Sequence, residues 1–255
     1  MSGPWKLGLL GVSLGHSQSP ALFEGLFKSA GVEGSYELLE FPDWESCEGF
    51  LTSDAAAGFA GFNVTVPFKS EAAAFCAELG GEAAAAGAVN VMLPIGAGRY
   101  RGENTDVQGF LGGVRPFLER QHERALVFGR GGAARAVAVG LEGLGIDVVH
   151  VVREVRPANP WRELASGELR EEVVRAWPLI VQATPIGTHP DVDACLPMIW
   201  EGVGEGHLVV DLVYNPAETA FMKRARAQGA TVLNGLPMLQ GQARMAWNLF
   251  RDNQR

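Results

Sequence analysis

Short apolar runs alternate with helix-like patterns along the whole chain of 255 residues. This alternation is typical of an α/β protein with mainly parallel strands, because parallel neighbours need a helical crossover between them. The longer apolar runs in the second half are typical of the buried sheet of a nucleotide-binding domain. Strands are expected near residues 7–10, 36–41, 61–66 and 88–93, and then near residues 126–128, 148–152, 179–183 and 208–213.

Helical patterns fill the intervals, and the first of them begins with Ser19 and Pro20, which are typical of an N-cap and a first helical residue. Helices are expected over residues 19–31, 44–51, 83–86, 106–119, 132–144, 161–176, 217–228 and 235–250. The last helix is expected to fold back on the first half. We therefore predict an α/β fold of two domains: an N-terminal α/β substrate domain (residues 1–105 plus 235–255) and a Rossmann-like, doubly wound dinucleotide-binding domain (residues 106–234).

Composition and charge narrow the classes of function. The net charge of −8 disfavours nonspecific attraction to nucleic acid or to an anionic membrane. Cys47, Cys76 and Cys195 are far apart in sequence and lack C-x-x-C spacing, so we expect neither a disulfide framework nor a metal site. No stretch approaches about 18 continuous apolar residues. These features predict a cytoplasmic protein that binds neither nucleic acid nor a membrane. A small-molecule substrate is expected, and a monomer and a homodimer are both left open.

A glycine motif follows the first apolar run of the second half. Gly129-x-Gly131-x-x-Ala134 stands between an expected strand and an expected helix, which is the context that a dinucleotide-binding turn requires. Glycines let the backbone approach a pyrophosphate, and the helix N-terminus offers it free N–H groups. The alternative is a tight turn without a ligand.

The end of the next expected strand carries charges of both signs. Arg153 and Glu154 stand where an arginine favours the 2′-phosphate of NADP and an acid favours the ribose of NAD. With Arg156 nearby and Arg130 inside the glycine motif, positive charges outnumber negative ones, which favours NADP over NAD. The alternative is that Arg153 and Glu154 form a solvated turn.

Lys69 and Asp106 are the candidates for acid/base chemistry. Only four of the 21 basic residues are lysines, and Lys69 ends the apolar block Asn63-Val64-Thr65-Val66-Pro67-Phe68-Lys69. A lysine can release a proton, which arginine does not do, and an aspartate can hold it in place. Sequence spacing leaves open a structural ion pair or two unrelated surface charges.

Ser17 and Ser19 follow the first expected strand, at a helix start where α/β proteins often hold ligands. Two hydroxyls at this spacing suit a carboxylate. The alternative is that Ser19 only caps the helix.

These blocks, in this order, resemble the shikimate dehydrogenase family over nearly the whole chain. The resemblance implies that Ser17 and Ser19 bind the substrate carboxylate, that Thr65 touches substrate, and that Lys69 is the catalytic acid/base oriented by Asp106. It also implies ring-hydroxyl contacts from Asn90 in Ala88-Val89-Asn90 and from Asp106 in Asn104-Thr105-Asp106. Two further substrate contacts are implied, Tyr214 and Gln242.

For the cofactor, the resemblance implies an NADP site. Its residues here are Gly129, Arg130, Gly131, Gly132, Ala133, Arg153, Leu212 and Gly235. The chain departs from the common family pattern at Arg130, which replaces an Ala, and at Val152 and Glu154, which flank Arg153 where the family commonly has Asn-Arg-Thr. NAD is therefore kept as the alternative cofactor.

The implied activity is the reversible NADPH-dependent reduction of 3-dehydroshikimate to shikimate, in the aromatic amino acid pathway. A quinate/shikimate dehydrogenase that uses NAD or both cofactors is the nearest alternative. Ser19, rather than Thr, resembles the shikimate-using members. A non-catalytic ligand-sensing paralogue is the alternative from another class, and the presence of both Lys69 and Asp106 disfavours it.

Overall fold

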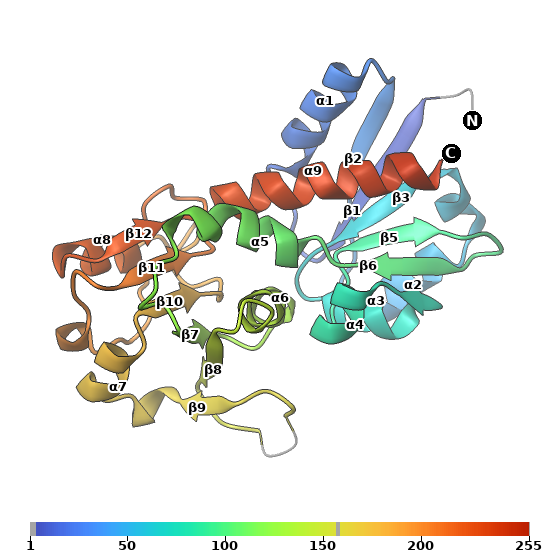
Figure 1. The fold of residues 1–255 in the computed structure, drawn as a ribbon. Coiled ribbons are helices and arrows are strands. Elements are labelled where there is room, and N and C mark those ends of the chain that lie inside the picture. Colours follow the sequence, from blue (N-terminus) through green and yellow to red (C-terminus); the bar gives the residue numbers. More distant parts are fainter. Residues whose placement is uncertain (1–3, 157–158, 255) are drawn as a thin grey trace. The chain divides into compact units, whose positions relative to one another are not determined.

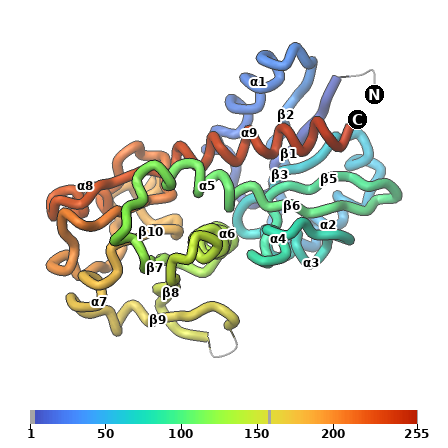
Figure 2. The backbone as a smooth tube through the Cα atoms, in the orientation of Figure 1, coloured from blue at the N-terminus to red at the C-terminus, as the bar shows by residue number. Residues whose placement is uncertain are grey.

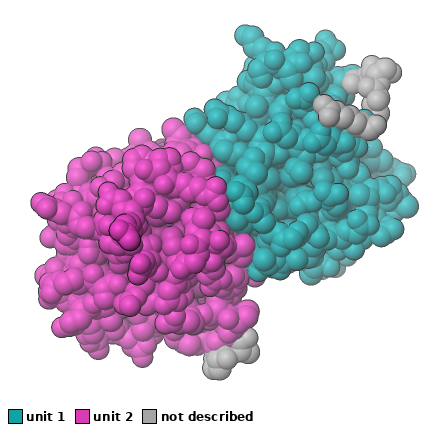
Figure 3. Space-filling view, in the orientation of Figure 1, with its two compact units in different colours: residues 1–109, 240–255 teal, residues 110–239 magenta. Residues whose placement is uncertain are grey.

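The computed structural model describes residues 4–156 and 159–254. The chain forms two compact units, residues 1–109 with 240–255 and residues 110–239 (Figure 3). Their boundaries fall inside helices α5 (Asp106–Val114) and α9 (Leu236–Asn253). The boundaries predicted from the sequence stand just before these two helices. Each unit has its own six-stranded sheet.

The first unit contains a mixed sheet with the order β2-β1-β3-β5-β6-β4. Strand β1 pairs in parallel with both β2 and β3, whereas β5 is antiparallel to β3 and β6. The parallel pairs are therefore β2-β1, β1-β3 and also β4-β6 at the far edge. The strands are β1 (Trp5–Gly11), β2 (Gly34–Glu40), β3 (Gly61–Val64), β4 (Glu78–Leu79), β5 (Val91–Pro94) and β6 (Tyr100–Glu103).

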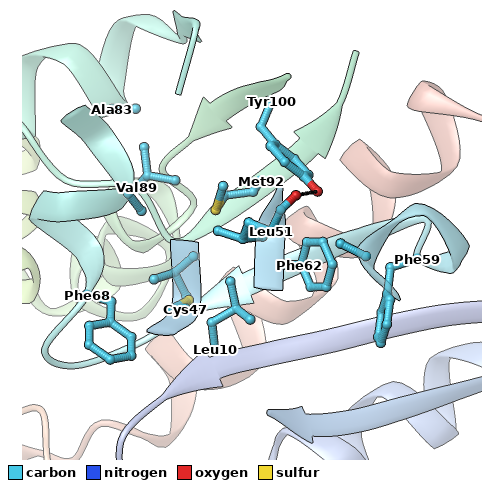
Figure 4. Close-up of a cluster of buried hydrophobic side chains, with 13 residues drawn as sticks. Leu10, Cys47, Leu51, Phe59, Phe62, Phe68, Ala83, Val89, Met92 and Tyr100 are labelled. Atoms are coloured by element: carbon cyan, nitrogen blue, oxygen red, sulfur yellow. Dashed lines mark hydrogen bonds between the residues drawn. The ribbon is translucent and has the colours of Figure 1, made fainter. Parts of the chain in front are cut away.

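Helices cover both faces of this sheet. On one face, a buried cluster joins Leu10, Phe62 and Met92 to α2 (Trp44–Leu51), the 3-10 turn Asp54–Gly58, α3 (Lys69–Phe75) and α4 (Gly81–Ala86) (Figure 4). On the other face, Leu7 and Val91 pack with α1 (Ser19–Ala30) and with the α9 residues Trp247 and Phe250. The predicted return of the last helix to the first half is confirmed.

The second unit contains a fully parallel sheet with the order β12-β11-β10-β7-β8-β9 (Figures 1 and 2). This is the Rossmann strand order, with the reversal between β7 and β10. Helix α6 (Gly132–Glu142) packs against β7 and β8, and α8 (Ala220–Ala227) packs against β11 and β12. The strands are β7 (Arg124–Phe128), β8 (Asp147–Val152), β9 (Glu163–Ala165), β10 (Leu179–Gln182), β11 (Leu208–Asp211) and β12 (Thr231–Leu233).

The prediction of one helix over residues 161–176 is wrong. This segment contains the edge strand β9, the 3-10 turn Ser166–Glu168 and the short helix α7 (Glu171–Ala176). Strand β9 forms because it pairs with β8, and this tertiary pairing overrides the helical preference of Glu, Leu and Ala. Strand β9 therefore places Glu163 at the sheet edge, opposite His150.

Two helix ends also differ from expectation. Helix α5 ends at Val114, and Pro116 then lies in the 3-10 turn Arg115–Phe117, because proline lacks the N–H that would continue the helix. Helix α8 begins at Ala220, where the hydroxyl of Thr219 accepts a hydrogen bond from the Met222 amide.

Candidate active site

Lys69 and Asp106 meet in the first unit. Lys69 is the first residue of α3 and Asp106 is the first residue of α5. The Lys69 Nζ atom lies 2.5 Å from the Asp106 Oδ2 atom, with side chains 12% and 5% exposed. The two side chains therefore form a nearly buried ion pair, and the alternative of unrelated surface charges is wrong. At such burial the charges are little screened by solvent, which suits a positioned proton donor.

Asn90 holds the other carboxylate oxygen of Asp106. Its Nδ2 atom lies 3.0 Å from Asp106 Oδ1 and 3.0 Å from Thr105 Oγ1, and 3.5 Å from Gln242 Oε1. Its Oδ1 atom accepts a hydrogen bond of 2.8 Å from the Thr105 amide. The structure thus brings together four predicted site residues: Lys69, Asn90, Asp106 and Gln242.

Asn104, which the sequence analysis did not assign to the site, fixes the start of α5. Its Oδ1 atom accepts hydrogen bonds from the amides of Asp106 and Val107, at 3.0 and 3.3 Å. Its Nδ2 atom donates to the carbonyl of Ala88 at 2.8 Å. Asn104 is buried, and it orients the backbone that carries Asp106. Its place one residue before Thr105-Asp106 is the typical N-cap signal.

Ser17 and Ser19 lie together after β1, as expected. The Ser19 amide donates to Ser17 Oγ at 3.2 Å, and Ser19 is buried. The alternative that Ser19 only caps α1 is wrong, because the N-cap residue is Gln18, which makes no side-chain cap hydrogen bond. Two hydroxyls in this arrangement suit a carboxylate ligand.

Tyr36 and Asn63 connect Ser19 to Asn90, and the sequence analysis missed both. Ser19 is hydrogen-bonded to the Tyr36 hydroxyl, which donates to Asn63 Oδ1 at 2.9 Å. The Asn63 Nδ2 atom donates to the Asn90 carbonyl at 3.2 Å. Burial raises the pKa of Tyr36 far above its usual range, so its hydroxyl stays a neutral donor. A hydrogen-bonded path therefore runs from Ser19 to Asp106.

Thr65 and Tyr214 differ in their relation to this network. Thr65 is half-buried directly after β3, and its amide donates to the Leu10 carbonyl at 3.0 Å. It therefore lies at the carboxyl end of the strand that carries Asn63. Tyr214 is half-buried in the second unit, three residues after the end of β11. Its contact with substrate stays a prediction.

The glycine motif forms the turn between β7 and α6. Gly129 has a φ of 112°, and a Cβ atom there would lie 3.3 Å from the Ala183 carbonyl oxygen. Gly131 is the N-cap residue, and a Cβ atom there would meet nothing within 4 Å. Gly132 and Ala133 are the first helical residues, and no side chain caps their N–H groups. This open helix start, at the reversal between β7 and β10, fits a dinucleotide pyrophosphate.

Arg130 does not lie free beside this turn. Its guanidinium donates to the Glu154 carbonyl, and its Nη1 atom lies 3.4 Å from Glu163 Oε1. Arg153 and Glu154 have exposed side chains after β8. The sequence-based count of charges around this turn left out Glu163, because that residue was predicted to lie in a helix. With Glu163 included, the excess of positive charge is smaller than expected.

Gly235 and Leu212 approach each other closely in the second unit. A Cβ atom at Gly235 would lie 1.9 Å from the Leu212 carbonyl oxygen, so only glycine fits. Nearby Asp211, which the sequence analysis did not select, is fully buried. Its carboxylate accepts hydrogen bonds from the Thr219 hydroxyl (2.6 Å) and the Val213 amide (3.0 Å). Burial raises the pKa of Asp211 to about 6, although these hydrogen bonds act in the opposite direction.

The described residues show neither a metal-binding cluster nor a helix suited to a membrane. In residues 4–156 and 159–254, no group of three or more His, Cys, Asp and Glu side chains is arranged to hold a metal ion. No helix within the same ranges has the length and apolar character needed to cross a membrane.

The Rossmann-ordered sheet with its open glycine turn, together with the buried Lys69–Asp106 pair, defines an α/β oxidoreductase that uses a nicotinamide dinucleotide. Comparison with known proteins identifies the family. The sequence model described as the shikimate dehydrogenase substrate binding domain matches residues 9–92. A shikimate dehydrogenase (NADP(+)) from Chlorobaculum tepidum is 34% identical, over 95% of this chain and 89% of that protein.

Solved structures agree with this assignment. Shikimate 5-dehydrogenase from Thermus thermophilus, in complex with NADP(H) and shikimate, has a TM-score of 0.85 and 35% identity, over 97% of this chain and 94% of that chain. Quinate dehydrogenase from Corynebacterium glutamicum, in complex with NAD, has a TM-score of 0.84 and 28% identity, over 98% and 94%. The chain belongs to the shikimate dehydrogenase family.

Proposed function

We propose that this chain catalyses the reversible NADPH-dependent reduction of 3-dehydroshikimate to shikimate. Its relatives from Chlorobaculum tepidum and Methanopyrus kandleri are named shikimate dehydrogenase (NADP(+)), at 34% and 33% identity. The observation that carries the proposal is the nearly buried ion pair of Lys69 and Asp106. Lys69 lies within the residues that match the family's substrate-binding domain.

The chemistry requires a hydride and a proton. Bound NADPH supplies the hydride to the C3 carbonyl carbon of the substrate. As the carbon–hydrogen bond forms, negative charge grows on the carbonyl oxygen, and Lys69 donates a proton to it to give the alcohol. In the reverse direction Lys69 takes the hydroxyl proton. Because that charge exists only as the reaction proceeds, the ammonium stabilises the transition state more than the bound substrate.

Asp106 acts by position and charge. Its Oδ2 atom holds the Lys69 ammonium at 2.5 Å, while Asn90 fixes its Oδ1 atom at 3.0 Å. A carboxylate held on both oxygens keeps the ammonium in one place. Proton transfer is then favoured to a substrate oxygen that is bound in one fixed position. We assign Asp106 as the second catalytic residue on this ground.

The remaining polar residues orient the substrate. Ser17 and Ser19 bind its carboxylate, because they lie together at the start of α1, where the Ser19 amide donates to Ser17 Oγ at 3.2 Å. Thr65, Asn90, Asp106 and Gln242 bind its ring hydroxyls, and Tyr214 is kept as a predicted substrate contact. Fixing the ring at several points converts binding energy into orientation of the reacting carbon.

We assign the two ligands to different units. The first unit binds the substrate, because it contains the serine pair and the Lys69–Asp106 network. The second unit binds the dinucleotide at the end of β7, as in other sheets of this order. The residues that would hold NADP are Gly129, Arg130, Gly131, Gly132, Ala133, Arg153, Leu212 and Gly235.

The direct test is the oxidation of shikimate with NADP+ and with NAD+, followed by the absorbance of the reduced nicotinamide. We expect turnover with both and a higher kcat/KM with NADP+. If calorimetry shows binding of shikimate and NADP+ but neither cofactor is reduced, the chain is a ligand-binding paralogue and the proposal is wrong.

A quinate/shikimate dehydrogenase that uses NAD is the second candidate. It is favoured by the likeness to the NAD complex of quinate dehydrogenase and by the acids Glu154 and Glu163 near the end of β8. The same assay with quinate separates the two candidates. A kcat/KM for quinate with NAD+ above that for shikimate with NADP+ would make the second candidate the better one.

A further inference from the structure

Glu163 is a buried acid at the edge of the second unit's sheet. It is the first residue of β9, and its side chain is only 1% exposed. Its Oε2 atom accepts a hydrogen bond of 2.7 Å from the Arg156 amide, and its Oε1 atom accepts one from the Asn159 side chain. A buried carboxylate requires such partners, because an uncompensated one is costly. Glu163 therefore anchors the segment that follows β8.

Arg130 supplies the compensating positive charge. It stands inside the glycine turn after β7, and its Nη1 atom lies 3.4 Å from Glu163 Oε1. Its other terminal nitrogen donates to the carbonyl of Glu154, one residue beyond Arg153. The Arg130 side chain thus links the pyrophosphate turn to the segment after β8. Its charge is balanced by Glu163 within the protein.

Nη1 of Arg130 keeps a free donor. The contact with Glu163 is an ion pair without hydrogen-bond geometry, and this buried nitrogen has no hydrogen-bond partner among the residues that the structure describes. A guanidinium nitrogen that is buried and unsatisfied favours an additional acceptor, such as a phosphate oxygen. The Arg130 side chain is 26% exposed, so a phosphate can approach its guanidinium, but it does so against the attraction of Glu163.

The adenosine ribose of a dinucleotide lies at the end of the second strand in this fold, here β8. Arg130 reaches the end of β8 through its hydrogen bond to the Glu154 carbonyl. The 2′-phosphate that NADP carries on this ribose would therefore lie near both Arg130 and Glu163. The nearby positive charges are Arg130, Arg153 and Arg156, and the negative ones are Glu154 and Glu163. Two of the three cationic charges are thus offset by acids.

We propose that Glu163 is a specificity-determining residue, which lowers the preference for NADP over NAD by neutralising Arg130. The inference rests on the proposed function, since it concerns the cofactor of the same site. The Glu163 carboxylate repels a 2′-phosphate and competes with it for the guanidinium, whereas a 2′-hydroxyl carries no charge and is little affected. Replacing the carboxylate by an amide of the same size removes both effects.

The test measures dissociation constants by calorimetry, with NADP+ and NAD+ as separate ligands and without turnover. Glu163→Gln should lower the dissociation constant for NADP+ at least about tenfold relative to that for NAD+, because one negative charge beside the phosphate is removed. Glu168→Gln is the matched control, since it makes the same charge change on an exposed side chain of the same unit. The control should leave the ratio of the two constants unchanged.

Arg130→Ala provides the opposite change. It leaves Glu163 without its cation, so the affinity for NADP+ should fall relative to the affinity for NAD+. This variant also keeps the proposal testable if Glu163→Gln does not fold. In the double variant the ratio should return towards the wild-type value, because the two charges cancel. This return separates a charge effect from a general disturbance of the turn.

The outcomes separate this inference from the proposed function. If the wild-type protein binds neither dinucleotide, the proposed function and this inference both fail. If it binds both, and Glu163→Gln leaves the ratio unchanged or shifts it towards NAD+, only the role of Glu163 is overturned. A shift of the same size in Glu168→Gln would also overturn it, since the effect would then come from net charge.

Discussion

The ammonium nitrogen of Lys69 lies 2.5 Å from a carboxylate oxygen of Asp106, although the two residues are 37 positions apart in sequence. Each residue begins a helix, α3 or α5, so the backbone of both is fixed. The side chains are 12% and 5% exposed. A buried ion pair of this kind suits the positioned proton donor that a carbonyl reductase requires.

Replacing Asp106 by Asn should lower kcat about a hundredfold or more, because the ammonium loses the charge that positions it. The measurement is the steady-state rate of shikimate oxidation. Glu45→Gln, which changes an exposed acid of α2, is the matched control and should keep the wild-type rate. A kcat within a few-fold of wild type in Asp106→Asn would show that Asp106 does not position Lys69.

Tyr36→Phe should raise the KM for shikimate about tenfold with little change in kcat. The change removes the hydroxyl that joins Ser19 to Asn63, so Ser19 loses its orientation towards the substrate carboxylate. Tyr36 thus acts on the substrate through Ser19. The same substitution in a Ser19→Ala background should therefore add almost nothing.

This double-variant cycle gives distinct outcomes. If Ser19→Ala itself leaves KM unchanged, Ser19 is not a carboxylate ligand. If Ser19→Ala raises KM and the Tyr36→Phe effect simply adds to it, the two residues act independently and the path from Ser19 to Asn63 has no role in binding.

Gly131→Ala should weaken NADP+ binding at least about tenfold while changing the free energy of unfolding by less than about 0.5 kcal/mol. The backbone at Gly131 has φ −69° and ψ 178°, which alanine adopts, and its Cβ would meet nothing within 4 Å. The added methyl group therefore obstructs only a ligand that approaches the turn. Calorimetry with NADP+ and urea unfolding measure the two effects.

Gly235→Ala is the contrasting variant. Its Cβ would lie 1.9 Å from the Leu212 carbonyl oxygen, so the variant should lose roughly 2 kcal/mol or more of stability before any ligand is added.

Equal affinity for NADP+ in Gly131→Ala and wild type would contradict the placement of the pyrophosphate at the turn between β7 and α6.

Asp211 should make stability fall as the pH rises from about 4 to 6. Its folded pKa of about 6 exceeds the ordinary value of 3.8, so in this window the folded chain holds a proton that the unfolded chain has lost. The contribution is about 2 to 3 kcal/mol, present at pH 4 and lost by pH 7. Asp211→Asn lacks this contribution.

Urea unfolding of wild type and Asp211→Asn at several pH values isolates the effect, because other groups titrate equally in both. The stability of wild type minus that of the variant should increase by about 2 to 3 kcal/mol from pH 7 to pH 4. A difference that stays constant over this range would contradict the raised pKa of Asp211.

Much of the fold was predictable, because local patterns and tertiary structure agree in most segments. The expected strand over residues 7–10 is the centre of β1, and the helix over residues 44–51 is α2. The glycine motif was placed correctly between β7 and α6 because its strand, turn and helix signals are contiguous. Strand β9 was missed because its three residues are held by pairing with β8.

The candidate site was predictable where residues belong to motifs. Lys69, Asn90, Asp106 and Gln242 came from separate blocks, and the structure brings them into one network. Tyr36 was not predictable, because its contact with Asn63 depends on sheet register.

That register is specific. Tyr36 lies opposite Leu7 on one side of β1, and Asn63 lies opposite Leu9 on the other side. Two residues that reach each other across an intervening strand leave no periodic signal in the sequence. Glu163 was missed for a related reason, since its carboxylate is buried by contacts with Arg130, Arg156 and Asn159 that depend on the pairing of β9 with β8.

The turnover of Lys69→Ala tests the central claim most directly, measured as shikimate oxidation with NADP+ alongside calorimetric binding of shikimate. We predict that kcat falls at least about a hundredfold while the dissociation constant for shikimate changes only a few-fold, because the variant loses a proton donor and keeps the other substrate contacts. A variant that binds shikimate and turns over near the wild-type rate would contradict the assignment of Lys69 as the acid/base.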